Sequence, residues 1–547
     1  MFSFLTPSPA TSHERPAHHA NATGSAFTNP WADQQPALAQ QVGYIDWIRQ
    51  RTQSIPSVEF AREHPVHVQP VQVVKPDFSP PGKGKVKATW LGHAGFLVHI
   101  TDDTSILFDP IFADRAGPSA GASGFAVGPA RWLPPPCTVD DLPSTVRFVA
   151  ISHNHYDHLD LPAILKLQQL HGDSLTYLVP LGNKAWFLQS GIPESQVVEL
   201  DWWQEFLAPL PSKERVSSQE RVRFTCVPAQ HNSGRSLLDQ RTTLWCGWIA
   251  ELFEPPAGGW SNYKTENDTE TESKADCEVE VGKRLACIYH TGDTGYGTPR
   301  GPAPFFADIG NRHGPIDLAM VPVWRGGSLS FVAAMGLKII EPPAGAPSAL
   351  STLHASPSDA LNIARDVKAR HSIAMHFGTF VGSVHEATEP LVEIALLRRK
   401  AVEKALRERL AEEAVSDETT QVEAPSLSPL RKESTGWLDG RRTSSPNSST
   451  TDLTRQETKD NGLLRRPTLG RASSSNSVKS VSAGSSPKPS AIASLAKASL
   501  SSLHLEQAAD GEYVDEAGMW KRDGGFGWLD IGASAIVECT QLQEVQS

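Results

Sequence analysis

Short apolar runs rich in β-branched and aromatic residues, separated by Gly, Asp and Pro, dominate the middle of the chain. The first is "KVKATWLGHAGFLVHI" (residues 85–100). Runs of this length between turn residues predict buried strands. The others are "SILFDP", "VRFVAIS", "LTYLVP", "RVRFTCVP", "TLWCGWIAELF", "RLACIYHTGD", "IDLAMVPVW" and "SIAMHFGTF".

Segments with helical periodicity fall between these strands. They include "LPAILKLQQLHG" and "SPSDALNIARDVKAR". Many strands interspersed with helices predict a layered α/β domain, built on two sheets or on one large mixed sheet. We place this domain at residues 85–410.

The remaining segments differ from this domain in composition. Residues 1–84 are rich in Pro, His and Gln and predict a partly disordered N-terminal arm with one helix at "QQVGYIDWIRQR". Residues 256–282 are polar and acidic and lie between two predicted strands, which indicates a long loop. Residues 411–510 predict a disordered insert, and residues 511–547 a final strand, in "GGFGWLDIGASAIVE", that returns to the domain.

The insert is serine-rich and basic. Between residues 421 and 504 there are 20 serines, with 12 Lys and Arg against 6 Asp and Glu. Such a segment buries too little apolar surface to fold by itself. Its "LLRRPTLGRASSS" could meet anionic lipid, and phosphorylation at Thr468 or Ser473 would weaken that attraction. An apolar or aromatic surface of the N-terminal arm is a second possible contact with the membrane, and for the insert a solvated linker without a role is the alternative.

Charge and cysteine content narrow the classes of function. The 547 residues carry 50 Lys and Arg against 61 Asp and Glu, a net charge of −11, which argues against nucleic acid as a partner. Six cysteines lie far apart without a CxxC pair, so neither a thiolate zinc site nor a disulfide scaffold is expected. The first residues lack an apolar stretch of signal-peptide length, and we expect an intracellular protein.

The segment "ISHNHYDHLD" (residues 151–160) concentrates metal-binding side chains directly after a predicted buried strand. Imidazole nitrogens and carboxylate oxygens are common zinc ligands. His153 and His155, two positions apart on an extended segment, can point together. Asp157 and His158 follow the turn and can reach a second ion, so the spacing suits two metals better than one.

Each zinc ion needs about four ligands, so further donors must come from elsewhere in the chain. Single donors follow apolar strands at His231 in "VPAQHNSG", Asp293 in "YHTGDTGY" and His376 in "IAMHFGTF". Any one of them alone is typical of an ordinary loop residue. Their appearance as a set after "HNHYDH" favours a common metal site.

This order of motifs resembles the metallo-β-lactamase superfamily, which implies an α/β fold, the four-layer αβ/βα sandwich, with a two-metal site at one edge. More narrowly, several segments are similar to the family of N-acyl-phosphatidylethanolamine-hydrolysing phospholipase D. They are "FTNPW", "TWLGHAGFLV", "FDPIF", "ISHNHYDHLD", "VPLGN", "ELDWW", "PAQH", "GDTGY" and "MHFGTF".

The resemblance implies a set of site residues and two Zn2+ ions as cofactors. One zinc would be held by His153, His155 and His231, the other by Asp157, His158 and His376, with Asp293 bridging them. Asp157 would also orient the attacking hydroxide. His354 matches a further active-site histidine of the family that could donate a hydrogen bond or proton to the phosphoryl or leaving oxygen, although an ordinary loop histidine fits that position equally well.

The implied activity is phospholipase D-type hydrolysis of a membrane phospholipid, N-acyl-phosphatidylethanolamine, to N-acylethanolamine and phosphatidic acid. Because no apolar segment is long enough to span a bilayer, we expect peripheral attachment to the membrane surface, and we leave open whether the protein forms a homodimer. Two alternatives stand beside this reading: hydrolysis of another phosphodiester, a lactone or a thioester, and a scaffold acting through the insert.

Three further residues receive a structural interpretation. We expect His93 in "WLGHAGF" and Asp109 in "LFDP" to shape turns beneath the site. His290, in place of an expected small residue before "TGDTGY", either crowds Asp293 or points away from it.

Overall fold

The computed structural model describes the greater part of the predicted domain and selected flanking segments. The described residues are 4–5, 15–31, 52–54, 71–120, 125–126, 128–210, 220–236, 238–256, 260, 282–298, 300–324, 337–339, 352–381, 387–397, 407 and 525–539. The helix expected in "QQVGYIDWIRQR", most of the loop 256–282 and the insert with Thr468 and Ser473 lie outside them.

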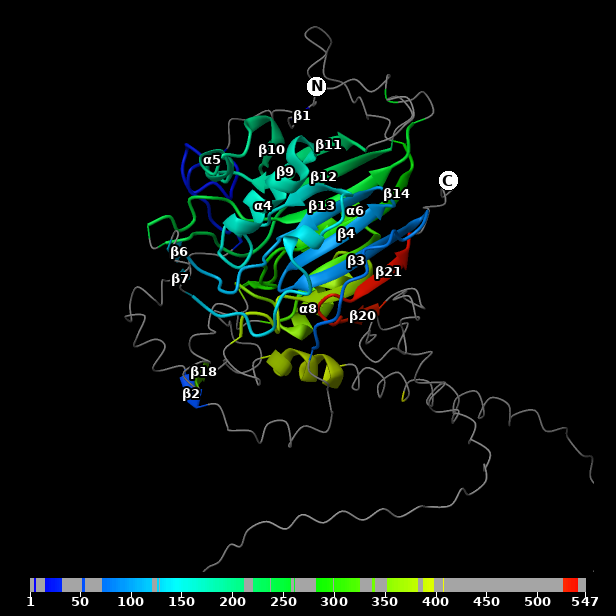
Figure 1. The fold of residues 1–547 in the computed structure, drawn as a ribbon. Coiled ribbons are helices and arrows are strands. Elements are labelled where there is room, and N and C mark those ends of the chain that lie inside the picture. The colour runs from blue at the N-terminus through cyan, green and yellow to red at the C-terminus, as the bar shows by residue number, and fades with distance from the viewer. Residues whose placement is uncertain are drawn as a thin grey trace, which may run out of the picture. The chain divides into compact units, whose positions relative to one another are not determined.

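Two large mixed sheets form the domain (Figure 1), which decides between the two arrangements left open by the sequence. The seven-stranded sheet has the order β10 (Val197–Leu200), β9 (Thr176–Pro180), β8 (Val146–Ala150), β5 (Thr104–Phe108), β4 (Gly95–Thr101), β3 (Lys85–Gly92), β21 (Ser534–Glu538). Its strands run parallel from β5 to β10 and antiparallel from β5 to β21.

The second sheet has eight strands. Their order is β1 (Phe4–Leu5), β11 (Glu205–Pro209), β12 (Arg221–Val227), β13 (Gly247–Phe253), β14 (Arg284–His290), β17 (Ile316–Pro322), β19 (Ala369–Met375), β20 (Gly525–Gly527). Neighbours from β14 to β20 are parallel, so β14, β17 and β19 end at the same edge of the sheet. The short strands are β2 (Thr52–Ser54), β6 (Ser119–Ala120), β7 (Phe125–Ala126), β15 (Gly297–Thr298), β16 (Gly301–Pro302) and β18 (Leu337–Ile339).

Side-chain alternation along the strands explains why the domain has layers on both faces of a sheet. In β4, Phe96 and Val98 join the large apolar core shared with the second sheet, while Leu97 joins a separate cluster. That cluster also contains Ile164 and Leu167 of a helix. Since successive side chains of a strand point to opposite faces, both faces of this sheet are buried.

Helices cover the outer faces of the two sheets. α4 (Leu161–His171) and α5 (Lys184–Gln189) contribute to the cluster on the seven-stranded sheet, and α8 (Pro357–Asp366) contacts β17 and β19 of the other and packs against α6 (Phe305–His313). Residues 387–397 form a further helix. Short 3-10 turns occur at Val139–Asp141, Gly172–Ser174 and Glu194–Gln196. The α/β sandwich expected from the sequence is therefore confirmed.

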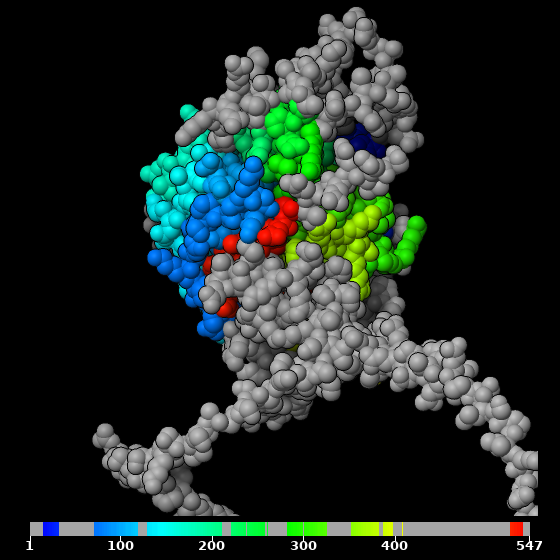
Figure 2. Space-filling view, turned by 90° about the vertical axis from the view of Figure 1, so that its right-hand side faces the viewer, coloured from blue at the N-terminus to red at the C-terminus, as the bar shows by residue number. Residues whose placement is uncertain are grey.

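The segment 525–538 joins the edges of both sheets. β20 pairs with β19 of the eight-stranded sheet, and β21 pairs with β3 of the seven-stranded sheet. Figure 2 shows these red residues at the surface between the blue region around β3 and yellow-green residues further along the chain. One late segment thus completes both sheets.

Candidate metal centre

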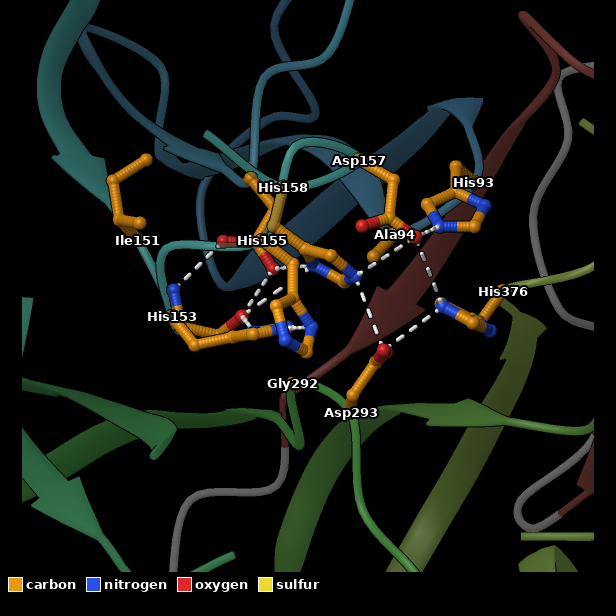
Figure 3. A network of polar contacts seen from close by, with 12 residues as sticks. His93, Ala94, Ile151, His153, His155, Asp157, His158, Gly292, Asp293 and His376 are labelled. Atoms are coloured by element: carbon orange, nitrogen blue, oxygen red, sulfur yellow. Dashed lines mark hydrogen bonds and ion pairs between the residues drawn. The ribbon is translucent and has the colours of Figure 1, made fainter. Parts of the chain in front are cut away.

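The loop after β8 carries four candidate ligands on a single turn (Figure 3). The main-chain nitrogens of His158 and Leu159 both donate to the carbonyl oxygen of His155 (3.1 and 2.9 Å), which closes the turn. Asp160 then caps α4 and accepts hydrogen bonds from the main chain after β5. These contacts direct the loop's donors toward the second sheet.

The other three predicted ligands lie at strand ends of the eight-stranded sheet. His231 follows β12, Asp293 follows β14, and His376 follows β19. Because β14 and β19 belong to the parallel part of the sheet, their carboxyl ends meet at one edge. The structure brings all seven predicted ligand residues together between the two sheets.

Imidazole nitrogens of the first group converge closely. His155 Nδ1 lies 2.8 Å from His153 Nε2 and 3.3 Å from His231 Nε2. His153 and His231 are buried, and His155 is partly exposed. Three imidazoles aimed at one point form a group that could hold a metal ion.

The second group surrounds the carboxylate of Asp293. Its Oδ2 atom lies 2.9 Å from His376 Nε2 and 3.2 Å from His158 Nε2, as Figure 3 shows. Asp157 Oδ2 lies 3.8 Å from the same nitrogen of His376. Asp293 Oδ2 is also 3.6 Å from His231 Nε2 of the first group, so this carboxylate faces both groups.

Hydrogen bonds outside the two groups fix which nitrogen three of the histidines, His153, His158 and His231, turn inward. Asp109 accepts from His158 Nδ1 (2.8 Å) and from the Ser152 hydroxyl (2.6 Å), and that hydroxyl lies 2.9 Å from His153 Nδ1. The Leu353 carbonyl lies 2.9 Å from His231 Nδ1. With Nδ1 used as a donor, the inward Nε2 atom keeps its lone pair for a metal.

His93 supports the second group through Asp157. Its Nε2 atom lies 3.0 Å from Asp157 Oδ2, while Thr379 Oγ1 accepts from its main-chain nitrogen and its carbonyl accepts from that of His376. His93, Asp109 and His376 all have positive φ values (54°, 40° and 60°), which non-glycine residues adopt rarely. Backbone strain of this kind concentrates at functional sites.

His354 lies beside both Asp293 and His231. Its Nδ1 atom lies 3.8 Å from Asp293 Oδ2, and its ring centroid is 5.0 Å from that of His231. Burial lowers the pKa of His354 to about 3. Its imidazole is therefore neutral at physiological pH and can donate one hydrogen bond without carrying a charge.

His290 points away from Asp293. Its ring stacks on Phe108 with centroids 4.9 Å apart, and its Nε2 atom lies 2.8 Å from the Ala94 carbonyl oxygen. The crowding left open by the sequence therefore does not occur. Gly292 allows its segment to pass close to Cys246 and Ser152, since a side chain there would meet the Cys246 carbonyl oxygen at 2.5 Å and Ser152 Cβ at 2.7 Å.

Burial and mutual repulsion favour neutral imidazoles in the first group. Burial, together with the neighbouring histidines, lowers the pKa of His153 well below its usual value, and burial likewise lowers that of His231. Although burial opposes it, His158 and His376 hold the pKa of Asp293 well below its ordinary range. Metal binding requires these protonation states, the neutral imidazoles of His153 and His231 and the ionised carboxylate of Asp293.

Buried polar atoms without hydrogen-bond partners are a further sign that these residues fit a bound metal. Several buried side-chain atoms in the centre make no hydrogen bond, and unsatisfied buried polar atoms are costly unless a ligand completes them. They are His158 Nε2, His376 Nδ1 and Nε2, Asp293 Oδ1, His354 Nδ1 and His93 Nδ1. Imidazole and carboxylate donors suit Zn, Fe or Mn.

Sequence reasoning placed Asp109 and His93 beneath the site without assigning them a role toward the ligands, and it did not single out Ser152. Each lies at or beside a strand end, as the predicted ligands do. Their contacts join residues as far as 286 positions apart, so a tight turn next to a polar residue is the only local signal.

Comparison with known proteins agrees with this geometry. Residues 104–259 match the family model described as the beta-lactamase superfamily domain. Together with the two-sheet fold and the cluster of candidate ligands, this match defines the class: the protein is a metal-dependent hydrolase of the β-lactamase superfamily.

Two curated relatives refine the assignment. "N-acyl-phosphatidylethanolamine-hydrolyzing phospholipase D 1" of Caenorhabditis elegans is 31% identical over 307 residues, which cover 55% of this chain and 67% of the relative. The chain belongs to the family of this phospholipase D. The Saccharomyces cerevisiae protein "N-acyl-phosphatidylethanolamine-hydrolyzing phospholipase D, mitochondrial" is 27% identical over 318 residues, covering 58% of this chain and 52% of that protein. The chain thus spans about two thirds of the first relative and about half of the second.

Among solved structures, Igni18, a metallo hydrolase of the archaeon Ignicoccus hospitalis, has a TM-score of 0.31 and 18% identity, covering 57% of this chain and 92% of that chain.

Within the part of the chain that the structure describes, no helix combines the length and apolar character needed to cross a bilayer.

Proposed function

We propose that the protein is a zinc-dependent phosphodiesterase that hydrolyses N-acyl-phosphatidylethanolamine to N-acylethanolamine and phosphatidic acid. The observation that carries the proposal is the convergence of seven histidine and aspartate side chains from both sheets on one buried centre. The similarity to two curated relatives with this activity in their names supports the choice of substrate.

We assign one zinc to His153, His155 and His231 and the other to Asp157, His158 and His376, with Asp293 shared between them. Two bound zinc ions would supply a nucleophile near neutral pH, by lowering the pKa of water to about 7, and positive charge for a phosphoryl oxygen. These are the two requirements for cleaving an anionic phosphodiester.

The protein's own side chains have separate tasks in this proposal. Asp157 accepts a hydrogen bond from the attacking water and orients it, while the contact from His93 holds its carboxylate in place. His354, neutral because burial lowers its pKa, donates a hydrogen bond to the phosphoryl or leaving oxygen rather than a full proton.

Access to a bilayer substrate calls for contact with the membrane surface, and we assign it to the basic insert. Two aromatic residues of the N-terminal arm are held by the domain instead: Phe27 is buried in the core, and Trp31 stacks on Trp202 and lies tilted against Phe305. Peripheral attachment and an intracellular location stay predictions, and whether the protein forms a homodimer stays open.

One preparation of the full chain tests the function. Its metal content is measured, and the release of N-acylethanolamine from vesicles containing the lipid is followed by mass spectrometry. We expect two zinc ions per chain and release of the product.

The variants His155→Ala and Asp293→Asn should abolish turnover while leaving folding largely intact. His171→Ala, on α4 and outside the candidate ligand groups, serves as the matched control and should retain the wild-type rate. Near-normal turnover in either site variant would refute the ligand assignment.

Bound zinc without the product would retain the hydrolase class and reject the lipid. Lactone, thioester and other phosphodiester substrates would then be assayed on the same preparation. Turnover of none of them would favour the scaffold alternative.

A further inference from the structure

The N-terminal segment 15–31 is fastened to the hydrolase domain by two adjacent histidines. His18 Nε2 and His19 Nε2 lie 2.6 and 2.7 Å from the two carboxylate oxygens of Asp201, which follows β10. The His18 ring stacks on Trp202 with centroids 4.3 Å apart. We call His18, His19 and Asp201 the arm clasp.

The arm clasp has the composition of a metal site, yet its hydrogen bonding differs from that of the metal centre. Asp201 Oδ1 also accepts from the main-chain nitrogen of Trp202 (2.8 Å). Among the described residues, none of the clasp's buried side-chain polar atoms lacks a hydrogen-bond partner, in contrast to His158 and His376. A fully satisfied cluster holds two segments together without requiring an ion.

The fastened segment reaches the backbone of a predicted metal ligand. Asn29 Nδ2 donates to the carbonyl oxygen of His231 (2.9 Å), and Asn29 Oδ1 accepts from Trp245 Nε1 (3.2 Å). The same indole nitrogen lies 2.9 Å from the Ala229 carbonyl. Asn29 therefore ties the two ends of the loop between β12 and β13, which carries His231.

A second contact holds this loop to the arm, and two more hold it to other parts of the domain. The main-chain nitrogen of Phe27 donates to the Arg241 carbonyl (2.9 Å). Asn154 of the "HNHYDH" loop accepts from the Gly234 nitrogen (2.7 Å), and the Leu353 carbonyl fixes the ring of His231. The loop is thus bonded both to the "HNHYDH" loop and to the N-terminal segment.

We propose that Asn29 is a positioning residue for His231, an inference that rests on the metal centre assigned under the proposed function. Its amide sets the main chain of His231, while Leu353 sets the side chain, so the inward nitrogen is directed at the first ligand group. The segment 15–31 is then part of the metal centre rather than an appendage to it.

Stepwise titration of the metal-free full chain with cobalt(II), followed by its visible absorption and by chelator competition, tests the proposal. His231→Ala serves as the reference that identifies the binding step of the first group. We expect Asn29→Ala to weaken that step about tenfold, as loss of a partner behind a metal ligand commonly does, and to leave the other step unchanged.

Asn21→Ala is the matched control, because Asn21 lies in the same segment but bonds only to Ser25 through its side chain in the described contacts. It should bind cobalt as the wild type does. Asn29→Asp is the near-isosteric second variant: it keeps the acceptor for Trp245 but turns an oxygen toward the His231 carbonyl, so it should weaken the step at least as much.

Wild-type affinity at the first step in both Asn29 variants would overturn the proposal. Equal weakening of both steps, with a lower melting temperature of the metal-free protein, would also overturn it, since that pattern indicates general loosening. Neither readout involves the lipid, so a failure of the substrate assignment is distinguishable from a failure of this inference.

Discussion

Asp109 offers the sharpest test of how the metal centre is organised, through the substitution Asp109→Asn. The carboxylate is fully buried and accepts three hydrogen bonds, from Ser152 N (2.7 Å), Ser152 Oγ (2.6 Å) and His158 Nδ1 (2.8 Å). An asparagine has the same shape but offers one oxygen and one NH2 group. If the oxygen keeps the main-chain bond, the NH2 group faces Ser152 Oγ and His158.

This exchange of an acceptor oxygen for a donor NH2 group changes the hydrogen bonding of both ligand groups. The hydroxyl of Ser152 must then accept from the amide and turn its proton toward His153 Nδ1, which moves the histidine's own proton to the inward Nε2. His158 faces an N–H instead of a carboxylate oxygen and is driven to the same tautomer. One ligand of each group loses the lone pair that a metal requires.

Loss of partners behind a metal ligand typically reduces affinity 10- to 100-fold, or about 1.4–2.7 kcal/mol. We therefore expect zinc bound to Asp109→Asn to be captured by a competing chromophoric chelator at correspondingly lower chelator concentration, at both sites. Asp317→Asn is the control, because Asp317 is buried and accepts from the Cys287 nitrogen (2.8 Å) but is not among the candidate ligands. Wild-type zinc affinity in a folded Asp109→Asn protein would refute the reasoning.

Three further predictions concern stability and the membrane. Despite burial, His313 and Arg223 lower the pKa of Glu251 to about 2, below its usual 4.5. The ionised carboxylate therefore stabilises the folded protein by about 3 kcal/mol, and this contribution is complete above pH 4.5 and lost as pH falls toward 2. Glu251→Gln should flatten the decline in the free energy of urea unfolding over that range, and an unchanged slope would contradict the assignment. Trp248→Phe removes the bond from its indole nitrogen to the Ile151 carbonyl (2.9 Å) and should lower the unfolding free energy by about 1–3 kcal/mol, whereas a loss below about 0.5 kcal/mol would show that the carbonyl finds another partner. Deleting residues 421–504 should reduce binding to anionic vesicles at low salt, and equal binding of the deleted and full chains would count against lipid contact by the insert.

The clustering of the candidate metal ligands was predictable because their signal is local. Four donors crowd one turn, and His231, Asp293 and His376 each follow an apolar run. Strand ends at one sheet edge meet in space, so the local pattern was enough to gather them.

The residues behind those side chains were less accessible to the sequence. Asp109 lies 49 positions before His158, and its role depends on which strands become neighbours. β10 and β11, with the sequences "VVEL" and "EFLAP", were not among the predicted strands; each contains a glutamate beside its apolar residues. Asn29, in a Pro-rich and weakly periodic stretch, gives no local sign that it contacts His231.

The position of β20 and β21 also bears on how the protein is made. Their partners β19 and β3 end at residues 375 and 92, while the completing strands begin only at residues 525 and 534. At about 5–20 residues per second, a ribosome needs roughly 10–30 s to translate the stretch from β19 to β21. For that interval the nascent chain carries two unpaired edges, one on each sheet, and exposed edges promote pairing with other chains. A chaperone that shields these edges during translation would therefore raise the yield of folded enzyme more than one acting after release.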